Sequence, residues 1–290
     1  MSRPPNAIPR TQHQDAGNAD EPTACSVFTD ALDRLAPRPG KPRKKGLTSL
    51  LDYGPGLHGW TMADGTADFL ALCGDFVDMT KIGGLNAIML PGGEVRRTAS
   101  IYRDHGIATY SGGLLFEFAR KSDNVDSLPR LLSELGIGAV EISENYLPLT
   151  DTALADSIRR MRRHDLDVIY EYGRKTPDAP LALEDLRRKR DVAFNAGAGH
   201  VVIEFAEVAT FLQQDELAWR SLCEELLTED VFIELDPTDF PASQIAAVHH
   251  AGPSANLANV APQHLLAVER LRRGLGYGAE CPLMERSRSS

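Results

Sequence analysis

The sequence has few of the features that mark secreted, membrane-bound or nucleic-acid-binding proteins. Its formal net charge is −10 at pH 7, so it lacks the basic surface that nucleic acids and anionic membranes require. No apolar run reaches the roughly 18 residues of a membrane-spanning helix, and residues 1–20 contain no hydrophobic segment typical of signal peptides. We therefore expect a cytoplasmic protein with neither a nucleic-acid partner nor a membrane partner.

Cysteine is scarce and scattered along the chain. The four cysteines are Cys25, Cys73, Cys223 and Cys281, and no two of them form a Cys-x-x-Cys pair. This spacing argues against zinc clusters and disulfide frameworks, and agrees with a reduced environment. The Gly-x-Gly-x-x-Gly fingerprint of dinucleotide-binding folds is also absent after the first predicted strand.

The chain does contain a regular alternation of apolar, β-branched runs and amphipathic segments. Its 42% content of hydrophobic residues is enough for a sizeable core. The strands are continuous apolar runs, as in parallel sheets whose two faces are both covered. Eight strand–helix units predict a single α/β domain, a (β/α)8 TIM barrel, with an open doubly wound sheet as the alternative. We expect strands at 46–54, 77–84, 107–113, 139–146, 167–173, 200–208, 231–237 and 255–260, and helices at 65–76, 91–106, 125–136, 150–165, 183–197, 217–227, 241–252 and 261–276.

The two ends of the chain differ from this repeating part. Residues 1–25 are polar and rich in Pro, Asn, Asp and Gln, which predicts a disordered N-terminal extension. Residues 26–45 combine a short helix with a Pro-rich basic connector. The barrel is expected over 46–276, and 277–290 form a loose C-terminal tail. The last helix of the barrel is a candidate interface of a homo-oligomer, because barrels of this kind often associate.

Several of the predicted strands end on an acidic residue. Glu141, Glu171 and Glu204 close the fourth, fifth and sixth strands, and Glu117 follows two glycines after the third. The carboxyl ends of TIM-barrel strands converge on one rim, so these carboxylates would repel one another unless a divalent cation lay between them. Oxygen-only ligands favour magnesium over zinc. The alternative is that each acid caps a helix or pairs with a basic side chain of the rim.

These stretches resemble those of the phosphosulfolactate synthases, TIM-barrel enzymes of coenzyme M biosynthesis that add sulfite to phosphoenolpyruvate. The resemblance extends over about residues 37–275, and SGGLLFE and NLANVAP are its most specific parts. The same family includes plant heat-stress-associated proteins that keep the fold. The matching stretches are RPGKPRKKGLT, DYGPGL, DMTKIG, YSGGLLFEFA, AVEISENYLPL, YEYGRKTP, HVVIEFAE and NLANVAPQHLLAVERLRRGL.

The resemblance implies a carbon–sulfur bond-forming enzyme that uses magnesium and small anionic substrates. Glu141, Glu171 and Glu204 would bind the metal, whose charge stabilises an enediolate-like species as a nucleophile adds to phosphoenolpyruvate. Lys175 would donate a proton, with its pKa lowered toward neutrality by burial and nearby cations. Lys81 matches a second lysine of the family. The expected substrate-binding residues are Asp52, Gly112, Gly113, Ser143, Arg174, Asn256 and Asn259.

Three loops depart from the family pattern. After Lys81 the family has Gly-Trp-Gly and a small hydroxyl residue, whereas this chain has Leu85 and Asn86 in that loop. After Glu204 the family has Ala-Arg, and here Ala206 takes the place of the arginine. Arginine binds sulfite and phosphate through paired hydrogen bonds, so one anion-binding group is missing.

The loop after the seventh strand adds Asp236 and Asp239 where the family tends to Glu-Ala-Pro. The rim is therefore more acidic than the family pattern. Three interpretations stay open: a synthase that uses phosphoenolpyruvate and sulfite, an enzyme with the same metal-assisted chemistry and another nucleophile or acceptor, and a non-catalytic, stress-associated barrel.

Overall fold

The computed structural model describes residues 24–54, 62–177, 181–212, 223, 230–276 and 281–284. The chain divides into a short unit that ends at Pro37 and a large unit that begins at Arg38. The short unit contains helix α1 (Ala24–Leu35). The predicted N-terminal extension lies almost wholly outside the described residues, as does most of the predicted C-terminal tail. In that tail, Pro282–Met284 form the 3-10 turn η4.

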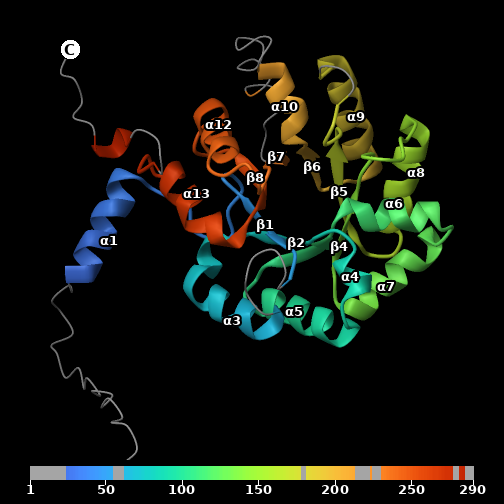
Figure 1. Ribbon diagram of the computed structural model, residues 1–290, viewed down its shortest axis with the longest axis horizontal. Coiled ribbons are helices and arrows are strands. Elements are labelled where there is room, and N and C mark those ends of the chain that lie inside the picture. The colour runs from blue at the N-terminus through green and yellow to red at the C-terminus, as the bar shows by residue number, and fades with distance from the viewer. Residues whose placement is uncertain are drawn as a thin grey trace, which may run out of the picture. The chain divides into compact units, whose positions relative to one another are not determined.

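The large unit is a closed barrel of eight parallel strands, in which each strand pairs with the next and β8 pairs with β1 (Figure 1). Helices surround the strands. The prediction of a TIM barrel is confirmed, and the open doubly wound sheet is excluded. The strands are β1 (Thr48–Asp52), β2 (Met79–Ile82), β3 (Ala108–Ser111), β4 (Ala139–Ile142), β5 (Asp167–Tyr172), β6 (His200–Ile203), β7 (Val231–Glu234) and β8 (Asn256–Val260).

Three of the helix ends show capping residues. Thr150 accepts a hydrogen bond from the N–H of Ala153 at the start of α8. Gly136 and Gly197 end α7 and α9 with φ angles of 71° and 104°, which glycine adopts without strain. The helices of the barrel are α3 (Met62–Cys73), α4 (Asn86–Met89), α5 (Gly92–Asp104), α6 (Gly113–Lys121), α7 (Leu128–Leu135), α8 (Asp151–Arg162), α9 (Leu183–Ala196), α10 (Phe205–Leu212), α12 (Ala242–Ala251) and α13 (Leu265–Arg272), with 3-10 turns η1 (Gly74–Phe76), η2 (Val125–Ser127) and η3 (Pro262–His264).

Three helices, α4, α6 and α10, occupy segments that the sequence pattern did not assign to helix. The predicted strand 200–208 ends at Ile203, and its second half forms α10. Helix α6 follows β3 directly and contains Glu117, which is therefore not a strand-end residue. The predicted helix 217–227 lies outside the described residues except for Cys223. None of the described helices is long and apolar enough to cross a membrane.

The core has two parts. One lies between the strands and the surrounding helices, and the other fills the inside of the barrel. Side chains alternate in direction along a strand, so every second residue faces the interior. The interior cluster consists of the buried residues Tyr110, Ala139, Ile169, Val202, Phe232 and Ala258.

Candidate active site

The acidic residues of the site continue the interior rows of the barrel. In four strands, a glutamate stands two residues after an apolar residue that faces the barrel interior. Each glutamate lies near the end of its strand or directly after that end. The side-chain period of two places these glutamates above the apolar interior, at the carboxyl ends of the strands. The pairs are Ala139 and Glu141, Ile169 and Glu171, Val202 and Glu204, and Phe232 and Glu234.

Three of these glutamates form a compact group, which we call the three-acid group: Glu141, Glu171 and Glu234. One carboxylate oxygen from each lies within 4.8 Å of the others, and all three side chains are buried. Lys81 reaches them from β2, with its Nζ 2.9 Å from both Glu141 and Glu234 and 4.0 Å from Glu171. Lys81 is the third residue of its strand rather than its last.

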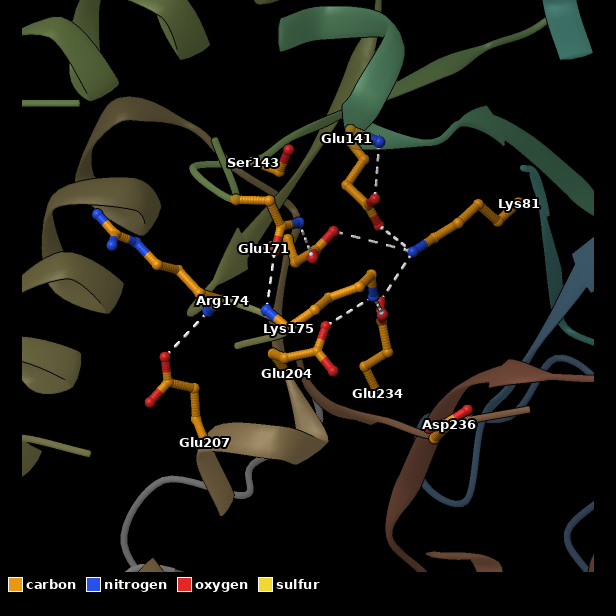
Figure 2. Close-up of polar contacts among 12 residues, drawn as sticks. Lys81, Glu141, Ser143, Glu171, Arg174, Lys175, Glu204, Glu207, Glu234 and Asp236 are labelled. Atoms are coloured by element: carbon orange, nitrogen blue, oxygen red, sulfur yellow. Dashed lines mark hydrogen bonds and ion pairs between the residues drawn. The ribbon is translucent and has the colours of Figure 1, made fainter. Parts of the chain in front are cut away.

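Lys175 approaches the group from the loop after β5. Its Nζ donates hydrogen bonds to Glu204 at 2.8 Å and to Glu234 at 2.6 Å. Figure 2 shows the ammonium groups of Lys81 and Lys175 both directed at Glu234. The side chain of Lys175 is 56% exposed and that of Lys81 is 6% exposed, so of these two lysines only Lys175 is accessible to a substrate.

Burial and like charges make two of the glutamates weak acids. Burial raises the pKa of Glu171 well above its usual range, and the carboxylates of Glu234 and Glu141 raise it further. Burial and the carboxylate of Glu234 raise the pKa of Glu204 to about 7. The site therefore holds more buried carboxylate than its own cations neutralise.

The ion pairs between the lysines and the glutamates shift other pKa values toward the charged forms. Burial alone would raise the pKa of Glu234, yet Lys81 and Lys175 together lower it to about 2. Burial would lower the pKa of Lys175, but the surrounding carboxylates, that of Glu234 first, outweigh burial and raise it. The expected shift of Lys175 toward neutrality is thus wrong for the protein alone, because its nearest charges are negative rather than positive.

The three-acid group fits a hard divalent cation. Its donors are all carboxylate oxygens, which suit Mg²⁺, and one oxygen from each of the three glutamates lies within 4.8 Å of the other two. With Glu204, four carboxylates face two ammonium groups, a formal excess of two negative charges. Glu204 lies beside this group and not in it; Glu234 takes the third position instead.

The N–H groups of Gly112 and Gly113 and the hydroxyl of Ser143 make hydrogen bonds within the protein, and both glycines line the cavity over the three-acid group. The N–H of Gly113 donates to Oε1 of Glu141 at 2.8 Å, and that of Gly112 donates to the carbonyl of Ile82 at 3.0 Å. A Cβ on Gly113 would collide with the side chain of Ser143. The hydroxyl of Ser143 donates to Glu117. The expected anion contacts from the two glycines and the serine are therefore not supported.

Asp52 and Asn256 also have structural partners. The carboxylate of Asp52 accepts hydrogen bonds from the Tyr102 hydroxyl at 2.9 Å and from the N–H of Gly54 at 2.7 Å. Asn256 is the first residue of β8, at the opposite end of the barrel from the three-acid group. Its amide joins the N–H of Leu47 to the carbonyl of Val231. The assignment of both residues to substrate binding is corrected accordingly.

Arg174 and Asn259 lie on different sides of the rim. Figure 2 shows the guanidinium of Arg174 directed away from the lysines and glutamates, and Arg174 lines a separate cavity with Glu144 and Lys189. Its predicted substrate contact is not supported. Asn259, near the end of β8, is 5% exposed and lines the cavity above the three-acid group. Its position agrees with a role in substrate binding.

Asn145 and Glu117 organise the site through contacts that the sequence did not indicate. Asn145 donates from its amide to Oε1 of Glu171 at 2.8 Å and accepts from the N–H of Lys175 at 3.2 Å. Glu117 accepts from the Ser143 hydroxyl at 2.5 Å and from the backbone N–H groups of residues 145–147. The loop that carries Asn145 is thus fixed by one buried carboxylate of α6.

Two neighbouring cavities open at this end of the barrel. The first, of about 260 Å³, lies over the three-acid group and both lysines. The second, of about 400 Å³, lies toward β6, β7 and α10. They share Leu51, Tyr53, Lys175 and Asn259. A chain with buried carboxylates, an accessible lysine and adjoining cavities at this rim has the elements of an active site.

Comparison with known proteins decides the family. The sequence profile described as "(2R)-phospho-3-sulfolactate synthase (ComA)" matches residues 36–277. The chain belongs to the phosphosulfolactate synthase family. The phosphosulfolactate synthase of Methanocaldococcus jannaschii is 30% identical over 240 residues, which cover 80% of this chain and 92% of that protein. That of Methanothermobacter thermautotrophicus is 29% identical over 258 residues, covering 85% and 96%.

Membership of the phosphosulfolactate synthase family makes this chain one of a group of carbon–sulfur bond-forming enzymes. A solved structure of lower similarity shows the fold alone. The dihydrodipicolinate synthase (Atu0899) of Agrobacterium tumefaciens has a TM-score of 0.50 and 16% sequence identity, and the match covers 80% of this chain and 74% of that chain.

Proposed function

We propose that this member of the phosphosulfolactate synthase family catalyses the Mg²⁺-dependent addition of a sulfur nucleophile to phosphoenolpyruvate. The observation that carries the proposal is the buried three-acid group beside an accessible lysine at the carboxyl end of the barrel. Burial of a carboxylate costs several kcal/mol unless it is paired, and the four carboxylates here outnumber the two ammonium groups that contact them, which supports a bound cation.

The three-acid group of Glu141, Glu171 and Glu234 would hold the metal. The N–H of Gly113 orients Glu141, and the amide of Asn145 orients Glu171. A bound Mg²⁺ would supply positive charge for the substrate carboxylate, where negative charge develops during the addition. Two positive charges also balance the formal excess of two negative charges in the site.

The two lysines have different tasks in this proposal. The sulfur lone pair forms a bond to the methylene carbon, and the electrons of the double bond move toward the carboxylate. Lys175 then gives a proton to the carbon that bears the phosphate, and nothing leaves the substrate. Lys81 is buried and bonded to Glu141 and Glu234, so it neutralises and orients these carboxylates.

The test is a phosphorus NMR assay of the protein with phosphoenolpyruvate, Mg²⁺ and sulfite, the nucleophile of the resembled family. A new phosphate-ester resonance that requires the nucleophile and disappears with a chelator is the expected result. The control omits sulfite. An unchanged spectrum, together with no Mg²⁺-dependent broadening of the phosphoenolpyruvate resonance, contradicts the proposed function, because the substrate then does not bind.

A further inference from the structure

The larger of the two cavities at the rim indicates which nucleophile the site accepts. We call it the acceptor cavity. It has a volume of about 400 Å³ and shares Lys175 with the cavity over the three-acid group. This volume is in the range of pockets for organic ligands, about 300–1,000 Å³, and is far larger than sulfite requires. The residues that characterise it are Phe205, Ala206, Leu235, Asp236, Asp239 and Asn259.

The charges of the acceptor cavity are unfavourable for a second anion. Among its described lining residues, Lys175 is the only cation, and that ammonium is already bonded to Glu204 and Glu234. Asp236 and Asp239 add two exposed carboxylates on the far side. Figure 2 shows Asp236 apart from the lysines and glutamates. A positively charged group is the natural partner of this side of the cavity.

Asn259 provides a second, independent sign of a ligand. Its amide is 5% exposed and lines both cavities, and its Oδ1 is buried without a hydrogen-bond partner. A buried polar atom without a partner destabilises the folded protein. The φ angle of 56° places this residue in the left-handed region, which asparagine tolerates better than most residues. Such a group is expected where a ligand completes the hydrogen bonding.

The remaining walls are apolar. Phe205 and Ala206, at the start of α10, and Leu235, after β7, present hydrocarbon to the cavity. A small inorganic anion gains nothing from such walls, whereas a carbon chain loses apolar contact with water there. The ligand that matches this lining has a hydrocarbon part and a positively charged end.

We propose that the acceptor cavity binds an organic thiol that carries a positively charged nitrogen, and that such a thiol is preferred over sulfite as the nucleophile. This inference rests on the proposed addition to phosphoenolpyruvate. The sulfur would lie toward Lys175 and the ammonium toward Asp236 and Asp239. The thiol S–H adds across the double bond: sulfur bonds to the methylene carbon, one proton reaches the neighbouring carbon through Lys175, and the phosphate ester stays intact.

Binding without reaction gives the first test. The probes are 2-(methylthio)ethylamine and 3-(methylthio)propanoate, thioethers of opposite charge that cannot add to phosphoenolpyruvate. Their affinities are measured by saturation-transfer NMR on the Mg²⁺- and phosphoenolpyruvate-treated protein. We expect the amine to bind about tenfold more tightly, and this ratio to fall about tenfold in Asp236→Asn/Asp239→Asn. Asp104→Asn, at the other end of the barrel, removes a charge and is expected to leave the ratio unchanged.

Equal affinity for the two thioethers, or an unchanged ratio in the Asp236→Asn/Asp239→Asn variant, overturns the assignment of the cavity. Turnover gives the second test, with cysteamine, 3-mercaptopropanoate and sulfite as nucleophiles. The quantity compared is the kcat/KM for cysteamine divided by that for 3-mercaptopropanoate. The intrinsic reactivity of the two thiols cancels when this ratio is compared between the wild type and the variant. We expect the cysteamine preference to fall about tenfold in the variant.

A higher kcat/KM for sulfite than for cysteamine in the wild type overturns this inference and leaves the proposed function in place. The proposed function fails separately, if phosphoenolpyruvate neither binds with Mg²⁺ nor reacts with any of the three nucleophiles. The thioether measurement does not depend on turnover, so it still decides whether the cavity selects a positive charge.

Discussion

Glu234 is the residue at which the two lysines of the site meet. Lys81 donates to its Oε2 at 2.9 Å and Lys175 donates to its Oε1 at 2.6 Å. The carboxylate is fully buried, and the two ammonium groups keep its pKa at about 2 despite that burial. Glu234 therefore orients both lysines: Lys81 in the interior and Lys175 at the surface of the cavity.

Replacement of Lys175 by alanine tests its role as proton donor. We expect Lys175→Ala to lower kcat by a factor of about 10² to 10⁴, the usual contribution of a positioned acid, with the fold retained because the side chain is largely exposed. The measurement is steady-state kinetics with circular dichroism as the check of folding. Lys121→Ala, at the end of α6, is the matched control. Full activity of Lys175→Ala would contradict the assignment.

Two asparagines of β8 allow a matched comparison of structural and functional roles. Asn256→Ala removes an amide that bonds Leu47 and Val231, so we expect the free energy of unfolding to fall by about 1–3 kcal/mol. Its kcat/KM should stay close to that of the wild type. Asn259→Gly removes the amide at a positive φ angle that glycine adopts freely. We expect it to lower kcat/KM with little change in stability.

Denaturant unfolding and steady-state kinetics on both variants check this comparison. The opposite pattern, in which Asn256→Ala impairs turnover and Asn259→Gly only stability, would show that the two asparagines have been assigned to the wrong ends of the barrel.

At the scale of elements, helix α6 fixes the loop that follows β4. Glu117 lies in α6 and is 2% exposed. Its two oxygens accept from Asn145, Tyr146 and Leu147 N–H groups at 2.7–3.0 Å. Asn145 then contacts both Glu171 and the backbone of Lys175. The position of β5 side chains in the site thus depends on a helix two strands away.

Glu117→Gln tests this dependence. A glutamine side chain has one oxygen acceptor and one NH₂ donor. The NH₂ group would therefore lie against backbone N–H groups, which are also donors and cannot bond to it. We expect faster amide hydrogen exchange at residues 145–147 and a lower kcat, with exchange elsewhere in the barrel unchanged. Glu184→Gln, on the outer face of α9, serves as the control. Unaltered exchange at 145–147 would show that the loop is held by other contacts.

The sequence predicted elements better than it predicted contacts. The strands could be placed because each is a continuous apolar run, but α6 and α10 begin only two residues after the ends of β3 and β6, so no loop marks their start. Asn256 and Asn259 are three residues apart in a strand, hence about 10 Å apart, which puts them at different heights in the barrel. The sequence alone did not distinguish these two positions, because both residues are asparagines in the same strand.

The acids show the same limit. Glu234 stands two residues after Phe232, just as Glu171 stands two after Ile169, and this spacing was the signal that would have identified it. The acidic ends of the fourth, fifth and sixth predicted strands pointed to Glu204 instead. The partner of each N–H group, as at Gly113, depends on the three-dimensional position of Glu141 and leaves no local pattern in the sequence.

At the scale of the whole barrel, the two ends have different electrostatic character. At the amino end of the strands, Arg38 pairs with Glu269 at 2.9 Å and Arg43 pairs with Asp78 at 3.1 Å, and the buried Arg272 donates to backbone carbonyls. At the carboxyl end, buried carboxylates exceed the ammonium groups that contact them. A cation that binds the carboxyl end should therefore stabilise the fold.

Thermal unfolding with and without Mg²⁺ measures that stabilisation. A ligand that binds only the folded state at 100 times its Kd contributes about 2.7 kcal/mol, which for a domain of this size raises Tm on the order of 5–10 °C. We expect Glu171→Gln to lose this increase while the metal-free Tm stays equal or rises, because burial and the neighbouring carboxylates disfavour the ionised form of Glu171 and glutamine has no such form. Glu204→Gln, outside the three-acid group, should keep most of the increase. Each variant removes one carboxylate from the same rim, so the two variants differ only in which carboxylate oxygens remain. If Glu204→Gln loses the increase in Tm and Glu171→Gln keeps it, Glu204 rather than the three-acid group binds the metal.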